Sequence, residues 1–182
     1  MKGLKEKYNK EIVPELQKHG KYSSVMAVPK VTKVVVNIGT GRLREKKESV
    51  EAAQKHLTMI TGQKLSPRPT KKAISSFKTR EGMIVGYKVT LRGKRMYDFL
   101  DRLINLAIPR MRDFRGIGLK SVDQGGSLTL GIREHIVFPE VMSENIKDIF
   151  GFEITVVSNS KSRDEAVELF RRMGFPLQKT NN

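Results

Sequence analysis

Polar and apolar residues alternate along residues 30–38, in the segment KVTKVVVNI. The alternation predicts a strand whose apolar face holds Val34, Val36 and Ile38. The opposite face of the same strand holds Lys33, Val35 and Asn37. A side-chain period of two is that of a β-strand, and a strand with one polar face is typical of an antiparallel sheet with one side open to water.

A second alternating segment, MIVGYKVTLR, covers residues 83–92. One face is predicted to carry Val85, Tyr87, Val89 and Leu91. The other is predicted to carry Ile84, Lys88, Thr90 and Arg92. Further strands are expected at residues 127–132 and 152–158, and a short extended piece at 63–68. Pro67 and Pro69 indicate that this last piece lies at an edge or leads into a loop.

Helical periodicity appears in five other segments. Residues 4–18, 46–60 and 94–108 repeat their apolar positions at about 3.6 residues, with Pro14 expected to kink or break the first helix. A short helix is expected at 143–149. The last helix begins with a capping box from Ser162 to Glu165 and ends at Gly174.

Together these segments predict a single α+β domain over all 182 residues. Its core is an antiparallel sheet with helices packed on one face, which leaves the other face free. The chain contains no internal repeat and no linker rich in glycine, serine or proline.

The net charge of +16 concerns partners rather than fold. Residues 62–120 hold 15 basic and 4 acidic residues, a net charge of +11, whereas residues 121–182 carry a net charge of −2. A polyanion is therefore the expected counterpart of the first two thirds, with nucleic acid the first candidate and an anionic membrane surface the competing one.

The loop at residues 68–82 concentrates this charge around one aromatic residue, Phe77. Its cations are Arg68, Lys71, Lys72, Lys78 and Arg80, and Ser75 and Ser76 lie beside the ring. Phe77 would stack on an unpaired RNA base while the cations neutralise phosphates. The alternative is that Phe77 tucks into the core and anchors the loop.

Other chemistry is weakly represented. The absence of cysteine excludes disulfides and thiolate sites. The turn NIGTGR has Arg44 where a dinucleotide fingerprint needs glycine. His19, His56 and His135 lack metal-ligand spacing and are expected at the surface or half-buried. Neither an enzyme, a cofactor nor a metal is therefore expected. The chain also lacks a long apolar segment and an apolar signal core, so a cytoplasmic protein without a membrane span is expected.

Two long blocks, KKAISSFKTREGM and KVTLRGKRMYDFLDRLINLAIPRMRDFRG, closely resemble the signature of the bacterial large-subunit ribosomal protein five family. The segments VPKVTKVVVNIGTG, MITGQK, LGIREHIVFPEV and DEAVELFRRMGFP resemble that family in order and spacing. The resemblance implies an antiparallel sheet covered by helices on one side, loosely like an RNA-recognition module. It also implies a structural constituent of the large ribosomal subunit that binds 5S rRNA in the central protuberance.

The resemblance further implies partners and contact residues. The partners are 5S rRNA, 23S rRNA, P-site tRNA, neighbouring 5S-binding ribosomal proteins and small-subunit protein thirteen, with no membrane. The resemblance implies contact with 5S rRNA at Lys33, Asn37, Gln63, Phe77 and Thr90. Arg92 is expected to join them, because it shares the predicted strand face of Thr90. The loop expected near tRNA carries Lys71, Lys72, Ser75, Ser76, Lys78 and Arg80.

The acidic last third suits a basic partner, and the resemblance supplies one in small-subunit protein thirteen. The carboxylates expected at this intersubunit bridge are Glu134, Glu140, Glu144 and Asp148. An ordinary solvated acidic face is the alternative.

The sequence departs from the family pattern in two places. VDQGGSL lacks the arginine and the aromatic residue of that pattern, so the resemblance gives no support to an RNA contact at residues 122–128. GMIVG lacks the proline that family members usually have there. A free-standing RNA-binding regulator or chaperone and a basic membrane-surface protein remain as alternative functions.

Overall fold

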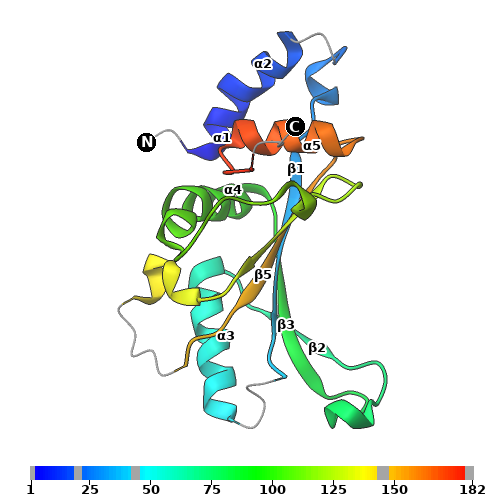
Figure 1. The fold of residues 1–182 in the computed structure, drawn as a ribbon, viewed down its shortest axis with the longest axis vertical. Coiled ribbons are helices and arrows are strands. Elements are labelled where there is room, and N and C mark those ends of the chain that lie inside the picture. Colours follow the sequence, from blue (N-terminus) through cyan, green and yellow to red (C-terminus); the bar gives the residue numbers. More distant parts are fainter. Residues whose placement is uncertain (1–2, 19–21, 42–45, 143–147, 179–182) are drawn as a thin grey trace.

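Five antiparallel strands form the centre of the computed structural model, which describes residues 3–18, 22–41, 46–142 and 148–178 (Figure 1). The strands are β1 (Val31–Gly39), β2 (Ser66–Pro69), β3 (Ile84–Leu91), β4 (Ser127–Ile132) and β5 (Phe152–Ser158). Their order across the sheet is β2-β3-β1-β5-β4. β1 is therefore central, and the proline-containing β2 lies at an edge, where the missing N–H groups of Pro67 and Pro69 cost least.

The α-helices lie on one side of this sheet or at one end of it. They are α1 (Leu4–Lys7), α2 (Val13–Lys18), α3 (Lys47–Thr61), α4 (Gly93–Arg102) and α5 (Arg163–Met173). In Figure 1, α3 and α4 lie on the same side of the sheet, and α1, α2 and α5 pack together at one end. The predicted α+β class, with an antiparallel sheet and helices on one face, is confirmed.

The core forms where the apolar face of β1 meets α3 and α4. Val34, Val36 and Ile38 are at most 2% exposed. Leu57 of α3 and Phe99 of α4 are fully buried. Burying side chains of this size contributes about 1.5–3 kcal/mol each. The alternation in β1 thus fixes which face of the sheet the helices cover.

Two π-helical turns each end two residues before a proline. Tyr8–Ile12 precedes Pro14, and Leu103–Ala107 precedes Pro109. A proline has no N–H and its ring collides with the carbonyl four residues earlier, and a π turn widens the helix at that point. The first predicted helix therefore continues through Pro14 as α1, a π turn and α2, whereas the other ends in a 3-10 turn at Ile108–Arg110.

Two local features depart from the sequence patterns. The register between β2 and β3 shifts between Arg68 and Pro69, and beyond this bulge Ile84 lines a hollow against α3 together with Tyr87. The prediction that Ile84 shares a face with Lys88 is therefore wrong. Most of the helix expected at 143–149 lies outside the described residues, and Asp148 and Ile149 are not helical.

Both ends of α5 match the prediction. Ser162 caps the helix by accepting a hydrogen bond from the Glu165 backbone N–H at 3.3 Å, and Gly174 ends it with a φ of 101°. None of the helices in the described parts of the chain combines the length and apolar character needed to cross a membrane.

Candidate nucleic-acid interface

The sheet face opposite the helices is polar, and its residues come from neighbouring strands. Asn37 of β1 lies opposite Lys88 of β3 on one side and Glu153 of β5 on the other. Val35 lies opposite Thr90 and Thr155 in the same way. Asn37 is exposed, and Lys88 and Thr90 are partly exposed. Since no described helix covers this face (Figure 1), its side chains are open to a partner.

Positive charge on this open face lies toward β3. Lys33 and Lys88 come from β1 and β3, whereas β5 contributes the exposed carboxylate of Glu153. A polyanion on the face would be attracted to the half formed by β1 and β3, and repelled from the half that carries Glu153.

Gln63 and Arg92 are held against the strand ends by hydrogen bonds. The side-chain amide of Gln63 donates to the Thr90 carbonyl oxygen at 3.3 Å. The guanidinium of Arg92 donates to the Thr32 carbonyl oxygen at 3.4 Å. The structure therefore brings five of the six predicted 5S-contact residues to the polar face or its margin, and Phe77 lies in the adjoining loop.

The basic loop, residues 68–82, has its own backbone structure. Ile74 and Thr79 form an isolated antiparallel bridge, with Ser75–Phe77 as a 3-10 turn between them. Lys78 has a φ of 48°, in the left-handed region where a residue other than glycine is uncommon. Phe77 is the last residue of this turn.

Phe77 is 69% exposed. The alternative interpretation, in which this ring anchors the loop in the core, is therefore wrong for the free chain. Lys71, Lys72, Ser75, Ser76, Lys78 and Arg80 are all exposed. Like Arg68, the four cations in this set form no ion pair within the described residues. Exposed, uncompensated cations beside an exposed aromatic ring suit a ligand that carries phosphates and bases.

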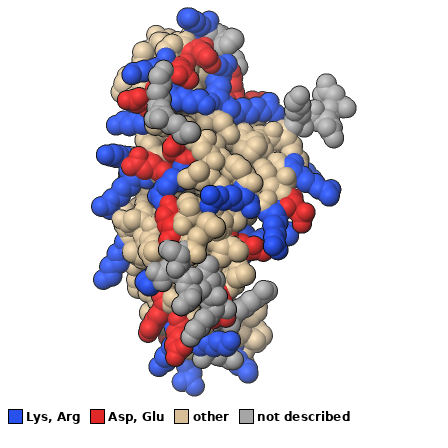
Figure 2. Space-filling model, turned by 90° about the vertical axis from the view of Figure 1, so that its left-hand side faces the viewer, with Lys and Arg blue, Asp and Glu red and all other residues tan. Residues whose placement is uncertain are grey.

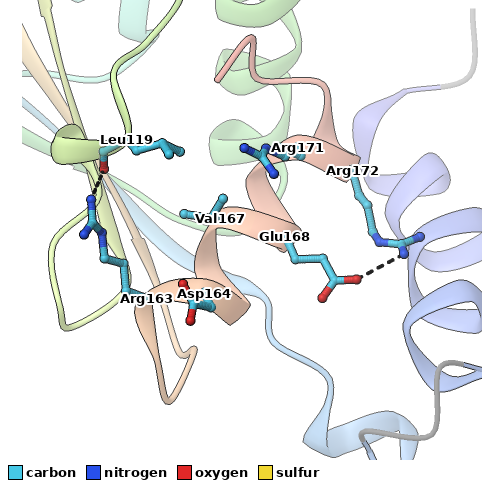
Figure 3. Close-up of a pocket in the computed structure, with 7 residues that line it drawn as sticks. All are labelled: Leu119, Arg163, Asp164, Val167, Glu168, Arg171 and Arg172. Atoms are coloured by element: carbon cyan, nitrogen blue, oxygen red, sulfur yellow. Dashed lines mark hydrogen bonds and ion pairs between the residues drawn. The ribbon is translucent and has the colours of Figure 1, made fainter. Parts of the chain in front are cut away.

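Charge on the helix-covered side is distributed differently. Figure 2 shows basic and acidic side chains interspersed there, without a broad area of one sign. A hollow of about 730 Å³ beside α5 has the same mixed character (Figure 3). Within it Arg163 donates to the Leu119 carbonyl oxygen at 2.7 Å, and Arg172 pairs with Glu168 at 3.1 Å and with Glu15. These arginines are engaged internally, so the hollow does not resemble an anion site.

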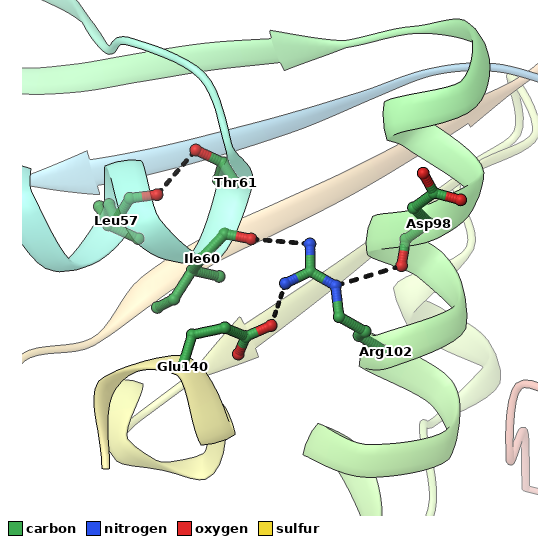
Figure 4. Close-up of polar contacts among 6 residues, drawn as sticks. All are labelled: Leu57, Ile60, Thr61, Asp98, Arg102 and Glu140. Carbon is green, nitrogen blue, oxygen red and sulfur yellow. Dashed lines mark hydrogen bonds and ion pairs between the residues drawn. The ribbon is translucent and has the colours of Figure 1, made fainter. Parts of the chain in front are cut away.

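Two of the carboxylates expected at the intersubunit bridge, Glu140 and Asp148, have partners within the chain. Glu140 pairs with Arg102, whose guanidinium also donates to the carbonyl oxygens of Ile60 at 3.0 Å and Asp98 at 3.4 Å (Figure 4). Asp148 accepts a hydrogen bond from the Ser49 hydroxyl at 2.5 Å.

Glu140 and Asp148 therefore each have a partner within the chain, and their role at the intersubunit bridge stays a prediction. Glu134 is partly exposed and has no ion-pair partner in the described segments. Glu144 lies outside the described residues.

His56 and His135 were expected at the surface or half-buried, and this expectation is wrong. They are 5% and 0% exposed, and their ring nitrogens lie 3.0 Å apart. His19 lies outside the described residues. Spacing along the sequence gave no indication of this pair, because α3 and the 3-10 turn at His135–Val137 meet only in the folded chain. The described residues contain no group of side chains suited to a metal ion.

Comparison with known proteins accounts for nearly the whole chain. The family model for "Ribosomal protein L5" matches residues 24–80, and the model for the C-terminus of the same ribosomal family matches residues 84–177. The chain is 47% identical over 177 residues to "Large ribosomal subunit protein uL5" of Halothermothrix orenii, covering 97% of this chain and 99% of the relative. It is 48% identical over 176 residues to the protein of that name from Brevibacillus brevis, covering 97% and 98%. The chain therefore belongs to the ribosomal protein L5 family, a structural constituent of the large ribosomal subunit.

Proposed function

We propose that this protein binds 5S rRNA through the open sheet face and the basic loop, and so helps to hold that RNA in the central protuberance. The proposal rests chiefly on the continuity of two features. The polar face of β1 and β3 leads directly into a loop that exposes both its cations and Phe77. The face supplies amide and hydroxyl groups, the loop supplies charge, and the ring supplies a stacking surface.

In this proposal Asn37 and Thr90 contact the RNA, and Gln63 supports the strand end. Short polar side chains on a sheet can hydrogen-bond to the base edges of unpaired nucleotides, whereas the base edges in the deep, narrow major groove of double-stranded RNA are out of reach of side chains. The RNA partner on this face is thus a loop or bulge of 5S rRNA rather than a regular helix. Contact with 23S rRNA and with neighbouring 5S-binding ribosomal proteins belongs to the same proposal.

The tip of the basic loop is proposed to contact P-site tRNA. Lys71, Lys72, Lys78 and Arg80 are exposed, and Ser75 and Ser76 offer hydroxyl groups to phosphate or ribose. A contact with small-subunit protein thirteen also remains a proposal. Glu140 pairs with Arg102, and Asp148 accepts a hydrogen bond from Ser49. Among the predicted bridge carboxylates within the described residues, Glu134 is therefore the one proposed to contact that protein.

The direct test is equilibrium binding of 5S rRNA to the full chain and to Asn37→Ala. Loss of a base contact is expected to cost about 1–3 kcal/mol of binding free energy without a change in melting temperature. Thr129→Ala on β4 is the matched control, because Thr129 is exposed on the same face, opposite Thr155 of β5 and outside the proposed footprint. Equal affinities for all three proteins would reject the proposed footprint.

Sucrose-gradient sedimentation of a lysate separates the remaining alternatives. The proposal requires that the protein sediment with the large subunit. A free-standing regulator or chaperone would stay near the top of the gradient, and a membrane-surface protein would pellet with membranes.

A further inference from the structure

The two edges of the sheet differ in how they are protected. The β2 edge contains Pro67, Pro69, the cation of Arg68 and a bulge. Devices of this kind keep an edge strand from pairing with another chain. The opposite edge, β4, has the sequence SLTLGI, with neither a proline nor a charged side chain. Its backbone can therefore pair with another strand wherever the rest of the chain leaves it uncovered.

Thr129 and Gly131 turn their backbone groups outward from the β4 edge. The alternation is fixed by Ser127, whose carbonyl oxygen accepts from the Asp123 backbone N–H at 2.9 Å and whose N–H donates to the Asp123 carboxylate at 2.7 Å. Every second residue of an antiparallel strand points its N–H and C=O groups the same way. The outward groups of Ser127 are thus satisfied by Asp123, whereas those of Thr129 and Gly131 have no backbone partner on that side within the described residues.

A hollow of about 560 Å³ lies beside this uncovered part of the edge. One wall is the end of β4, Leu130–Ile132, and the other is the segment at residues 111–116. In the described parts of the chain no backbone hydrogen bond joins the two walls. The half-buried Met111 and Phe114 contribute apolar surface to the lining. The hollow therefore offers apolar contact at the place that a further strand would take.

The rim of this hollow carries positive charge. Arg112, Arg115 and Arg133 line it and are exposed, and none of them forms an ion pair within the described residues. Of the two carboxylates in the lining, Asp113 is exposed and Glu134 is half-buried. The arginines outnumber the carboxylates, so an occupant with carboxylate side chains is favoured over a basic one.

We propose that the β4 edge pairs with an extended, acidic segment of a neighbouring protein in the large subunit, which adds a sixth strand beside Thr129 and Gly131. Alternate side chains of that segment lie on the apolar lining of the hollow, and a carboxylate pairs with the arginines of the rim. A polypeptide is favoured over RNA, because a strand edge presents N–H and C=O groups at the spacing of another backbone.

This inference goes beyond the proposed function and does not depend on it. The β4 edge lies outside the proposed 5S rRNA footprint, which belongs to β1, β3 and the basic loop. The occupant also differs in charge from a basic partner. Gly131 favours the pairing, since a strand glycine without a side chain lets another backbone approach closely.

Gly131→Pro tests the pairing. It removes the outward N–H of residue 131 and leaves the hydrogen bonds between β4 and β5 in place, because proline is tolerated on the outer side of an edge strand. Gly131→Ala is the matched control, since it keeps the N–H and its Cβ would meet nothing within 4 Å. Thr129→Pro removes the other outward N–H and serves as the second variant, should Gly131→Pro fail to fold.

The readout is photocrosslinking in purified large subunits. The chain has no cysteine, so Asp113→Cys provides a single site on the rim for a benzophenone label. Mass spectrometry after digestion identifies the crosslinked peptide or nucleotide. We expect one acidic peptide of a neighbouring protein, with a yield that falls about tenfold in Gly131→Pro and stays within about twofold in Gly131→Ala.

Charge reversal tests the role of the arginines. Arg112→Glu with Arg115→Glu should lower the yield of the same crosslink about fivefold or more. Lys120→Glu with Lys161→Glu alters two exposed lysines outside the hollow and should leave the yield unchanged. A crosslink to RNA, the absence of any crosslink to protein, or equal yields in Gly131→Pro and Gly131→Ala would overturn the inference. Equal yields in the two charge-reversed proteins would overturn the acidic character of the partner.

Discussion

His135 donates a hydrogen bond from its Nε2 to Nδ1 of His56, 3.0 Å away in the protein interior. The direction follows from the other nitrogen of His135, which accepts from the Phe150 backbone N–H at 3.4 Å. The His135 ring also stacks on Phe150, with centroids 3.9 Å apart. Nδ1 of His56 and Nδ1 of His135 each accept a hydrogen bond in this arrangement, so neither nitrogen carries a proton.

This pair predicts a loss of stability in mild acid. Burial, together with the neighbouring His56, lowers the pKa of His135 from 6.5 to about 4. The unfolded chain then binds a proton at a higher pH than the folded chain, so stability is full above pH 6.5 and falls toward pH 4. Between about pH 7 and about pH 5 the loss should be on the order of 2 kcal/mol.

Urea unfolding followed by circular dichroism measures this loss. His135→Phe keeps an aromatic ring in the stack and removes the titrating group, so its stability should change much less over the same range. A wild-type unfolding midpoint that stays constant from about pH 7 to about pH 5 would contradict the neutral pair.

Arg102 is expected to stabilise the fold without affecting RNA binding. Arg102→Met would leave the partly buried Glu140 carboxylate and the Ile60 carbonyl without their donor, at a cost of about 2 kcal/mol in unfolding free energy. Adding Glu140→Met removes the unpaired charge and should recover part of this loss. If the double variant is no more stable than Arg102→Met, the ion pair with Glu140 does not account for the stabilisation by Arg102.

Gly86 is expected to be far less tolerant than Gly39, its partner across β3 and β1. A Cβ on Gly86 would lie 2.5 Å from the Ile38 backbone oxygen, whereas one on Gly39 meets nothing within 4 Å. Gly86→Ala should therefore cost about 2 kcal/mol or more, because the two strands must move apart, and Gly39→Ala less than about 1 kcal/mol. Thermal melts of the two alanine variants make the comparison. Equal melting temperatures would show that the strands accommodate a Cβ atom at Gly86 without loss of stability.

Phe77 is expected to matter for RNA and not for stability. Because Phe77 is 69% exposed, Phe77→Ala should change the unfolding free energy by less than about 0.5 kcal/mol. Loss of a stacked base should weaken 5S rRNA binding by about 1–3 kcal/mol. A large drop in melting temperature together with unchanged RNA affinity would assign the ring a structural role instead.

The strands could be predicted from the sequence because one face of each is buried. Val34, Val36 and Ile38 alternate with polar residues, and burial of that face imposes the pattern. The N-terminal cap of α5 could be predicted as well, because its hydrogen bonds join residues three or four apart. Local rules suffice where the determining contacts are local.

Long-range contacts explain what the sequence did not reveal. Ile84 changes face because of a bulge set by pairing with β2. Glu140 forms an ion pair with Arg102, 38 residues away, and His56 contacts His135, 79 residues away. The basic loop was recognisable from its composition, but the bridge between Ile74 and Thr79 within it was not.

Contact between the basic loop and RNA phosphates underlies the whole proposed function, and the salt dependence of 5S rRNA binding is its sharpest test. If about four to six phosphates are neutralised, log K should fall with log salt at a slope on the order of −3 to −5. Lys71→Gln with Lys78→Gln should reduce the magnitude of this slope by about 1.5. The charge-matched control, Lys120→Gln with Lys161→Gln, alters two exposed lysines outside the loop and should leave the slope unchanged. A wild-type slope near zero, or equal slopes for both double variants, would contradict this contact.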